Sequence, residues 1–303
     1  MKVSLLNRAV AVALPFVPKP IVWRVSRRYI AGTSLNDALG AAADLNALGV
    51  SATIDVLGED VKTASVAQGY RDLYLRAMDE IAVRNARCYV SVKLTEMGLR
   101  VDEDLCRGIL DELAAASKAH DSFLRIDMED SSVTSVTLDI YRELRRKYDR
   151  IGVVLQACLR RTENDIAELL DDGIANVRLC KGIYLEPEEI AYQGQQEIRD
   201  AFGRQLRLLV KGGAEFVAIA THDPPVAEHA VQLLKETGFS KTHYEFQSLL
   251  GVAEGMRDGL VAAGHPLRVY VPFGEAWFAY SQRRLRENPQ IAGHIMRNLF
   301  SRG

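Results

Sequence analysis

Two pairs of basic side chains are the first candidates for chemistry in this sequence. Arg283 and Arg284 follow Tyr280 by three and four positions, so on a helix all three share nearly one face. Two neighbouring guanidinium groups form a fork that binds a carboxylate or a phosphate. The alternative is that the two arginines belong to a solvated basic helix surface, but a tyrosine on the same face favours a binding site. Arg178 and Lys181 form a second pair, which suits an anionic ligand.

A lysine and three acidic residues form the next set of candidates. Asp127, Glu129 and Asp130 could hold Mg²⁺, but in a strand Asp127 and Glu129 share one face while Asp130 points away. We therefore expect Asp127 to pair with Lys93, and we expect no metal site. Lys93 and Lys181 also keep open a Schiff-base chemistry of the aldolase kind, in which a lysine amine attacks a carbonyl group.

Motifs for several other chemistries are missing from the sequence. No histidine belongs to an HxxxH or lies beside a CxxC, so zinc is not expected. There is no GxSxG for a serine nucleophile. Neither GxGxxG nor GxxxxGK[ST] occurs at a strand–helix junction, so no local motif supports a nucleotide. Local motifs alone leave open whether the anionic ligand is a flavin or a phosphosugar.

These side chains need a framework that brings distant segments together. Short apolar segments rich in Val and Ile alternate with longer segments of helical periodicity, which indicates parallel strands buried on both faces. The apolar segments are Ser51–Leu57, Cys88–Leu94, Phe123–Met128, Gly152–Leu159, Asn176–Leu179, Phe216–Ala220, His243–Gln247 and Leu267–Val271. Eight such units over roughly 250 residues predict an α/β fold, a closed (β/α)₈ barrel.

Helix signals agree with this alternation. Ser34 and Asp37 have the spacing of a capping box, and Gly49 is suited to end the helix that they open. Thr162 and Asp165 open another helix in the same way, after the fourth apolar segment. The helix from Ser34 precedes the first strand and lies outside the eightfold count.

The predicted strands end in many polar residues, at the face where barrel enzymes keep their active sites. Charged groups in a barrel mouth are costly unless they are paired or bind a ligand. The polar residues at these ends are Glu59, Lys93, Thr95, Asp127, Glu129, Asp130, Gln156, Arg178, Lys181, Thr221, His222, Asp223, Glu245, Gln247 and Tyr270. Their convergence predicts an enzyme in preference to an inert scaffold or a binding module.

Composition sets the cellular context. The 303 residues carry a formal net charge of −2 and no basic stripe, which excludes the usual footprint of a nucleic-acid-binding protein. The four cysteines are dispersed and lie mostly in or beside apolar segments, which indicates buried thiols and a reducing, cytoplasmic compartment.

Residues 1–33 are predicted to form a helical N-terminal arm, and residues 34–303 to form the barrel. Prolines interrupt the apolar run Ala9–Val17, basic residues follow it, and it is too short to span a bilayer. We expect the arm to pack on the barrel; the alternative is that its apolar and basic residues touch a membrane surface.

Read together, the strand ends resemble the proline dehydrogenase family from about Tyr29 to Asn288. The matching stretches are TIDVLGE (Thr53–Glu59), SVKLT (Ser91–Thr95), RIDMED (Arg125–Asp130), GVVLQACLRRTEND (Gly152–Asp165), VRLCKGIY (Val177–Tyr184), ATHD (Ala220–Asp223), YEFQSLLG (Tyr244–Gly251) and VYVPFGEAWFAYSQRRLREN (Val269–Asn288). Each is weak alone, but eight in order at strand ends are specific, and the last, with its YxxRR, is the strongest.

The resemblance implies a distorted (β/α)₈ barrel with FAD bound noncovalently across the strand ends and L-proline against the flavin. It implies catalytic roles for Arg178, near flavin N5, and for Asp127, which would hold Lys93 in place. The substrate-binding residues it implies are Glu59, Lys93, Leu249, Tyr270, Tyr280, Arg283 and Arg284. The FAD-contacting residues it implies are Met128, Gln156, Arg178, Lys181, Gly182, Ile183, Thr221 and His222.

The implied reaction oxidises L-proline to Δ1-pyrroline-5-carboxylate and passes the electrons to a membrane quinone. Peripheral contact with the inner face of the cytoplasmic membrane is therefore expected, with a separate pyrroline-5-carboxylate dehydrogenase acting downstream. Ile183 and Cys158 depart from the family pattern near the flavin. A hydroxyproline-oxidising variant and a Schiff-base lyase are the alternative enzymes; Tyr280 favours unsubstituted proline over the first.

Overall fold

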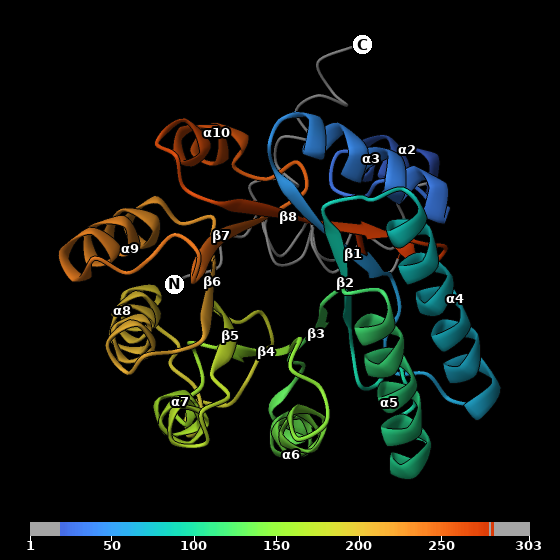
Figure 1. Ribbon diagram of the computed structural model, residues 1–303, viewed down its shortest axis with the longest axis horizontal. Coiled ribbons are helices and arrows are strands. Elements are labelled where there is room, and N and C mark those ends of the chain that lie inside the picture. Colours follow the sequence, from blue (N-terminus) through green and yellow to red (C-terminus); the bar gives the residue numbers. More distant parts are fainter. Residues whose placement is uncertain (1–18, 279, 282–303) are drawn as a thin grey trace.

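The computed structural model describes residues 19–278, 280 and 281, and its eight parallel strands close into a barrel (Figure 1). The strands are β1 (Ser51–Val56), β2 (Cys88–Val92), β3 (Leu124–Ile126), β4 (Ile151–Gln156), β5 (Asn176–Cys180), β6 (Phe216–Ala220), β7 (Tyr244–Leu249) and β8 (Leu267–Phe273). Each strand pairs with the next one along the chain, and β8 pairs with β1. The predicted barrel and its eight strands are confirmed.

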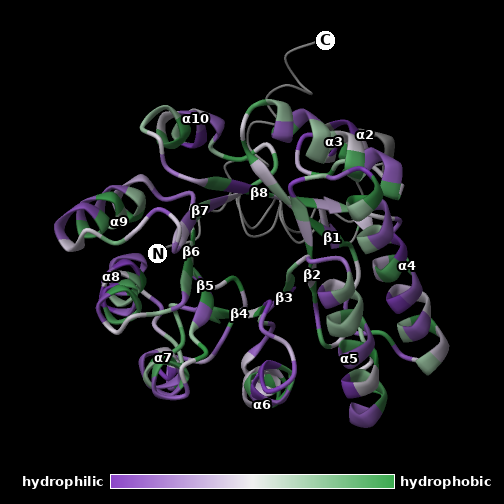
Figure 2. Cartoon of the chain, viewed as in Figure 1, coloured by the Kyte–Doolittle hydropathy of each residue, from purple (hydrophilic) through white to green (hydrophobic). Residues whose placement is uncertain are grey.

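A helix follows each of the first seven strands and covers the outside of the barrel (Figure 1). These helices are α4 (Ala64–Val83), α5 (Glu103–Ala119), α6 (Thr134–Arg145), α7 (Thr162–Asp171), α8 (Gln195–Lys211), α9 (Pro224–Thr237) and α10 (Glu254–Ala262), with the short 3₁₀ helix η2 (Ser131–Val133) before α6. Hydrophobic and hydrophilic residues share each outer helix (Figure 2). In α8 the buried residues include Phe202, Leu206 and Leu209, a spacing that gives one apolar face toward the barrel.

Two further helices precede the first strand, α2 (Lys19–Ser26) and α3 (Leu35–Ala47). The predicted capping box of α3 is confirmed, because the Asp37 amide donates to Ser34 Oγ at 3.2 Å and the Ser34 amide donates to Asp37 Oδ2 at 2.9 Å. Gly49 follows the helix with φ +81°, a left-handed conformation that glycine adopts without strain.

The capping box predicted for α7 is not formed, although the helix begins at Thr162 as expected. The Thr162 hydroxyl donates instead to the carbonyl of Gln156 at the end of β4, at 2.6 Å. Asp165 accepts hydrogen bonds from Arg161, at 2.9–3.1 Å. A tertiary contact with the strand end therefore replaces the local cap.

Helix α2 and the segment that connects it to α3 lie against β8 and the residues just after it. The Ala31 amide donates to the carbonyl of Pro272 in β8 at 2.9 Å. The rings of Trp23 and Trp277 meet edge to face, with centroids 4.7 Å apart. The described part of the arm thus packs on the barrel. None of the helices that the structure describes is long and apolar enough to cross a membrane.

A buried ion pair lies in the barrel interior near the N-terminal ends of the strands, away from the end at which the strands finish. Glu245, the second residue of β7, accepts a hydrogen bond from Arg268 Nε at 2.7 Å. Arg268 also donates to the carbonyl of Ala52 at 2.6 Å and lies over the ring of Tyr89, 4.0 Å from its centroid. Glu245, which we placed at the mouth from its sequence position, is therefore part of the barrel floor.

We predict that Glu245→Gln lowers the free energy of unfolding by about 3 kcal/mol, because Arg268 is left charged and buried without its carboxylate. Denaturant unfolding monitored by circular dichroism measures the change. Glu168→Gln is the matched control, since Glu168 pairs with Arg142 on the exposed outer surface and should cost less than about 1 kcal/mol. Equal losses in the two variants would contradict the assignment of Glu245 to a buried pair.

Candidate active site

The carboxylate of Asp127 is the centre of a buried polar cluster in the barrel mouth. Its Oδ1 accepts hydrogen bonds from Ser91 Oγ and Arg178 Nη1, both at 2.7 Å. Its Oδ2 accepts one from the Tyr270 hydroxyl at 2.6 Å. Asp127 follows β3 directly, whereas its three partners lie on β2, β5 and β8. One carboxylate therefore joins side chains from across the barrel, and three of the predicted site residues meet at it.

Lys93 enters the same mouth but pairs with a residue that the sequence analysis did not single out. Its ammonium group donates to the carboxylate of Asp55, a residue of β1 that is 1% exposed. The predicted ion pair between Lys93 and Asp127 is therefore not formed. Both oxygens of Asp127 already accept hydrogen bonds from Ser91, Arg178 and Tyr270.

The surroundings of Lys93 keep it protonated. Burial lowers the pKa of Lys93, but nearby acidic groups, first among them the hydrogen-bonded carboxylate of Asp55, outweigh burial and raise that pKa above its ordinary value. A lysine attacks a carbonyl group only as the neutral amine. The other candidate, Lys181, donates to Asp223 at 2.5 Å. Both lysines are thus engaged as cations, which weakens the Schiff-base alternative.

Arg178 has donors left over for a ligand. It is 5% exposed, and its Nη1 is used by Asp127. Its Nε and Nη2 are buried and have no hydrogen-bond acceptor among the residues that the structure describes. A buried donor without an acceptor costs about 1–3 kcal/mol. The arrangement therefore favours a ligand with hydrogen-bond acceptors beside Arg178.

The residues around Gly182 leave no room for a side chain. Gly182 has φ +97°, and a Cβ placed on it would lie 2.3 Å from Cys158 Sγ and 3.2 Å from Gln156 Oε1. Gln156 is itself held by a hydrogen bond from its Nε2 to the carbonyl of Glu129, at 2.8 Å. Only a glycine therefore fits at this position, directly after Lys181, because any side chain would collide with Cys158.

Lys181 is held in position by a carboxylate and a second cation. Asp223 Oδ2 accepts from Lys181 Nζ at 2.5 Å and from Arg199 Nε at 2.8 Å. The Asp223 amide donates to Thr221 Oγ1 at 3.1 Å. Two cations around one carboxylate leave a net positive charge, which suits an anionic group such as a phosphate.

His222 and Leu249, both predicted to be site residues, are hydrogen-bonded to each other. The Leu249 amide donates to His222 Nε2 at 2.8 Å, so Nε2 is unprotonated and a neutral ring carries its proton on Nδ1. This contact fixes the orientation of the imidazole at the mouth and joins the ends of β6 and β7.

The three acidic residues considered for Mg²⁺ have separate partners. The partners of Asp127 are Ser91, Arg178 and Tyr270. Glu129 accepts a hydrogen bond from the Thr95 amide at 3.0 Å, and Asp130 pairs with Arg100. Within residues 19–278, 280 and 281, no three His, Cys, Asp or Glu side chains gather in a way that could hold a metal ion.

Comparisons with known proteins identify the family of this chain. A sequence profile of the family described as Proline dehydrogenase matches residues 38–297. Proline dehydrogenase 2 of Bacillus subtilis (strain 168) is 36% identical over 262 residues, which are 86% of this chain and 86% of the relative. Proline dehydrogenase of Deinococcus radiodurans is 31% identical over 284 residues, 92% of this chain and 91% of the relative. This chain belongs to the proline dehydrogenase family.

A solved structure supports the fold of this family member. The crystal structure of proline utilization A (PutA) from Bdellovibrio bacteriovorus, inactivated by N-propargylglycine, matches 92% of this chain with a TM-score of 0.84 at 23% identity. This chain spans about a third, 36%, of that PutA chain. The bifunctional protein PutA of Escherichia coli (strain K12) is 27% identical, and this chain covers 23% of it.

Of the remaining site residues predicted for a proline dehydrogenase, the structure describes Tyr280, Met128, Ile183 and Glu59. Tyr280 is 8% exposed and packs with Ile30 and Leu57, beside the N-terminal arm. Met128 is buried and Ile183 is 41% exposed. Glu59 is exposed on the loop after β1. Arg283 and Arg284 lie outside the described residues, so their proposed grip on a carboxylate stays a prediction.

The sequence analysis missed several residues that build the site, chiefly Asp55, Ser91, Glu96 and Arg199. Asp55 could have been found, because it lies in the matching stretch TIDVLGE and alternation along β1 turns it inward with Thr53. Nothing in the local sequence marks Arg199, which reaches Asp223 from the middle of a helix.

Glu96 is a fully buried carboxyl group beneath Lys93. It is 0% exposed; its Oε2 accepts from the Tyr74 hydroxyl at 3.1 Å, and its Oε1 has no partner among the described residues. Burial raises the pKa of Glu96 well above its ordinary value, and nearby Asp55 adds to this, although Lys93 opposes it. The geometry and the pKa direction both favour a protonated, neutral Glu96.

We predict that Glu96→Gln removes a pH dependence of stability. A raised pKa means that the folded protein holds this proton more tightly than the unfolded chain, so wild-type stability falls as pH rises above the ordinary value of 4.5. Relative to Glu96→Gln, the wild-type loss reaches at most about 1.4 kcal/mol per pH unit. Urea unfolding of both proteins from about pH 5 to about pH 8 measures it.

The exposed Glu228→Gln on α9 is the control for that series. Its stability should follow the wild-type curve at every pH. Parallel curves for wild type and Glu96→Gln would show that Glu96 has no raised pKa in the folded state.

Proposed function

We propose that this chain oxidises L-proline to Δ1-pyrroline-5-carboxylate in the barrel mouth, with FAD as its cofactor. The observation that carries the proposal is the buried cluster of Asp127, Arg178, Tyr270 and Lys93, in which Arg178 keeps two donors without acceptors. Membership of the proline dehydrogenase family supplies the substrate class.

The residues present are compatible with FAD. Arg178 offers its two unused donors, and Lys181 with Arg199 offers positive charge for phosphate groups. Bound FAD would supply the oxidant, which accepts a hydride from C5 of proline. The residues proposed to hold it are Met128, Gln156, Arg178, Lys181, Gly182, Ile183, Thr221 and His222.

The chain's own residues would bind and orient the substrate. Lys93 remains charged because of its neighbouring carboxylates, so it can attract the proline carboxylate together with Arg283 and Arg284. Tyr270, fixed by its hydrogen bond to Asp127, would form one wall of the proline site, and Leu249 and Tyr280 would form others. Glu59, on the exposed loop after β1, would close the site. Holding the reacting atoms in one geometry is the main contribution of such groups.

Two further roles are the stabilisation of developing negative charge and the acceptance of the proton from the proline nitrogen. Arg178 lies beside Asp127 and would stabilise negative charge that develops next to its free donors during the reaction. Proline must lose a proton from its ring nitrogen before C5 can release a hydride. Because Lys93 is held as a cation, we propose that water accepts that proton.

The cellular context of the reaction is part of the same proposal. We propose that the electrons pass on to a membrane quinone and that the protein acts in the cytoplasm, in peripheral contact with the inner face of the membrane. The product would be oxidised further by a separate pyrroline-5-carboxylate dehydrogenase. No nucleic acid or metal ion has a part in this scheme.

The deciding experiment is anaerobic addition of L-proline to the purified protein reconstituted with FAD. We expect the visible flavin absorption to bleach with L-proline and to persist with D-proline and with hydroxy-L-proline. A bound flavin that keeps its colour would preserve the cofactor but require another electron donor. Failure to bind FAD at all would overturn the proposed function.

We predict that Arg284→Met raises the KM for L-proline steeply while FAD stays bound. Loss of a charged hydrogen-bond partner of a bound carboxylate typically costs about 2–5 kcal/mol. Steady-state kinetics with an artificial electron acceptor give KM, and absorbance gives the flavin content. Arg76→Met, on the exposed surface of α4, is the control. Loss of flavin with an unchanged KM would move Arg284 from the substrate to the cofactor.

A further inference from the structure

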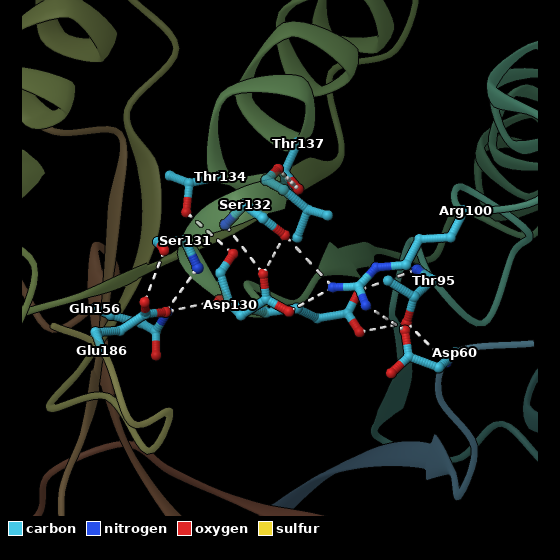
Figure 3. Close-up of polar contacts among 12 residues, drawn as sticks. Asp60, Thr95, Arg100, Asp130, Ser131, Ser132, Thr134, Thr137, Gln156 and Glu186 are labelled. Atoms are coloured by element: carbon cyan, nitrogen blue, oxygen red, sulfur yellow. Dashed lines mark hydrogen bonds and ion pairs between the residues drawn. The ribbon is translucent and has the colours of Figure 1, made fainter.

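Arg100 connects two loops of the barrel mouth that are distant in sequence. It lies on the segment between β2 and α5, and its Nη1 is 3.0 Å from Asp60 Oδ1, in the loop after β1. Its Nη2 pairs with the carboxylate of Asp130, in the loop after β3, and lies 3.5 Å from Ser132 Oγ. Figure 3 shows the guanidinium between the two carboxylates.

The loop after β1 is also held through its backbone. Asp60 has φ +51°, a left-handed conformation that costs a non-glycine residue energy and persists only when neighbours enforce it. Its amide donates to Thr95 Oγ1 at 3.0 Å. Thr95 in turn donates through its hydroxyl to Glu129 at 2.5 Å. The ends of β1, β2 and β3 are thereby joined at one side of the mouth.

A second carboxylate joins the loop after β3 to the loop after β5. The two oxygens of Glu186 accept hydrogen bonds from the amide and from the hydroxyl of Ser131, each at 2.7 Å. The Glu186 carbonyl accepts a further bond from Gln193 Nε2 at 2.9 Å, which keeps the loop folded on itself. The loop after β5 is the one that carries Lys181 and Gly182.

We propose that Asp60, Arg100, Asp130, Ser131, Ser132 and Glu186 form a mouth brace that positions the loop after β1 for substrate and the loop after β5 for the cofactor. The inference rests on the proposed function, which assigns Glu59 to proline and Lys181 to FAD. Arg100 and Glu186 are positioning residues: their hydrogen bonds and ion pairs are to loop residues, and none is to Asp127, Lys93 or Arg178.

Charge explains why Arg100 matters more than an ordinary surface arginine. Without it, the carboxylates of Asp60 and Asp130 face each other with no cation between them and repel. Asp60 would then lose the contact that helps to enforce its left-handed backbone. The loop should spread away from the mouth and take Glu59 with it, whereas the buried groups that contact proline stay in place.

The first test compares Arg100→Met with Arg107→Met. Arg107 also bridges two carboxylates, Glu103 and Glu143, but on the outer helices away from the mouth. In Arg100→Met we expect the KM for L-proline to rise about three- to tenfold, from the cost of ordering the loop on binding, with kcat changed less than about twofold. Amide hydrogen exchange of residues 58–62 should accelerate in this variant alone.

Two further variants separate positioning from general damage to the fold. Adding Asp60→Asn to Arg100→Met removes one of the repelling carboxylates and should restore part of the KM. Arg100→Lys keeps the charge but cannot bind both carboxylates with a planar fork, so its KM should be intermediate. If Arg100 were needed only for overall stability, neither the double variant nor Arg100→Lys would have a KM closer to that of wild type than Arg100→Met has.

The second test compares Glu186→Gln with Glu189→Gln, an exposed residue of the same loop. A glutamine keeps one acceptor oxygen and no negative charge, so at most one of the two bonds that Ser131 donates remains, and that bond is no longer strengthened by charge. We expect FAD to dissociate about three- to tenfold faster from Glu186→Gln, measured by the flavin fluorescence that appears after dilution of the holoprotein. Glu189→Gln should release FAD at the wild-type rate.

The outcomes distinguish the brace from the proposed function. If the wild-type flavin is not bleached by L-proline, the proposed function fails, while hydrogen exchange and flavin release still test the brace. If wild type oxidises proline but Arg100→Met matches Arg107→Met in KM and in exchange, Arg100 does not position the loop. Equal flavin release from Glu186→Gln and Glu189→Gln would overturn the cofactor half of the brace.

Discussion

The carboxylate of Asp127 is the constraint on which the arrangement of the mouth depends. It accepts hydrogen bonds from side chains of β2, β5 and β8, so these three strands must present inward-pointing residues close to one point in the barrel. Burying this charge is unfavourable unless its partners are close and well oriented. The closed barrel provides that orientation, because each strand is fixed by two neighbours along its length.

The two central ion pairs of the mouth are balanced in charge but not in hydrogen bonding. Asp55 offsets Lys93, and Asp127 offsets Arg178. Arg178 nevertheless keeps two buried donors without acceptors among the described residues. An unsatisfied donor beside a satisfied ion pair is what a binding site requires, since a ligand can then add hydrogen bonds without breaking the pairs that hold the site together.

Sequence alone was sufficient for the framework and for most residue types of the site, but not for the contacts. The eight strands could be found because parallel strands buried on both faces read as continuous Val- and Ile-rich segments. The ion-pair partner of Lys93 could not be predicted, because alternation along a strand gives only the direction of a side chain. Asp55 and Asp127 both point inward, and Asp127 is bound by three other side chains.

Glu245 was misplaced because β7 continues to Leu249, which leaves Glu245 near the start of the strand. Thr162 had the spacing of a helix cap, yet a carbonyl at the end of β4 competes for its hydroxyl.

Cys158 and Ile183, both near Gly182, differ in what their surroundings permit. Cys158 is buried, and burial raises the pKa of its thiol to about 12, so the reactive thiolate is disfavoured. Its Sγ occupies the space into which a Cβ at position 182 would project. A larger side chain at 158 would have to turn away from Gly182 or displace it. Ile183, by contrast, is 41% exposed. Cys158 therefore limits which residue fits at position 182, whereas Ile183 changes only the surface of the same loop.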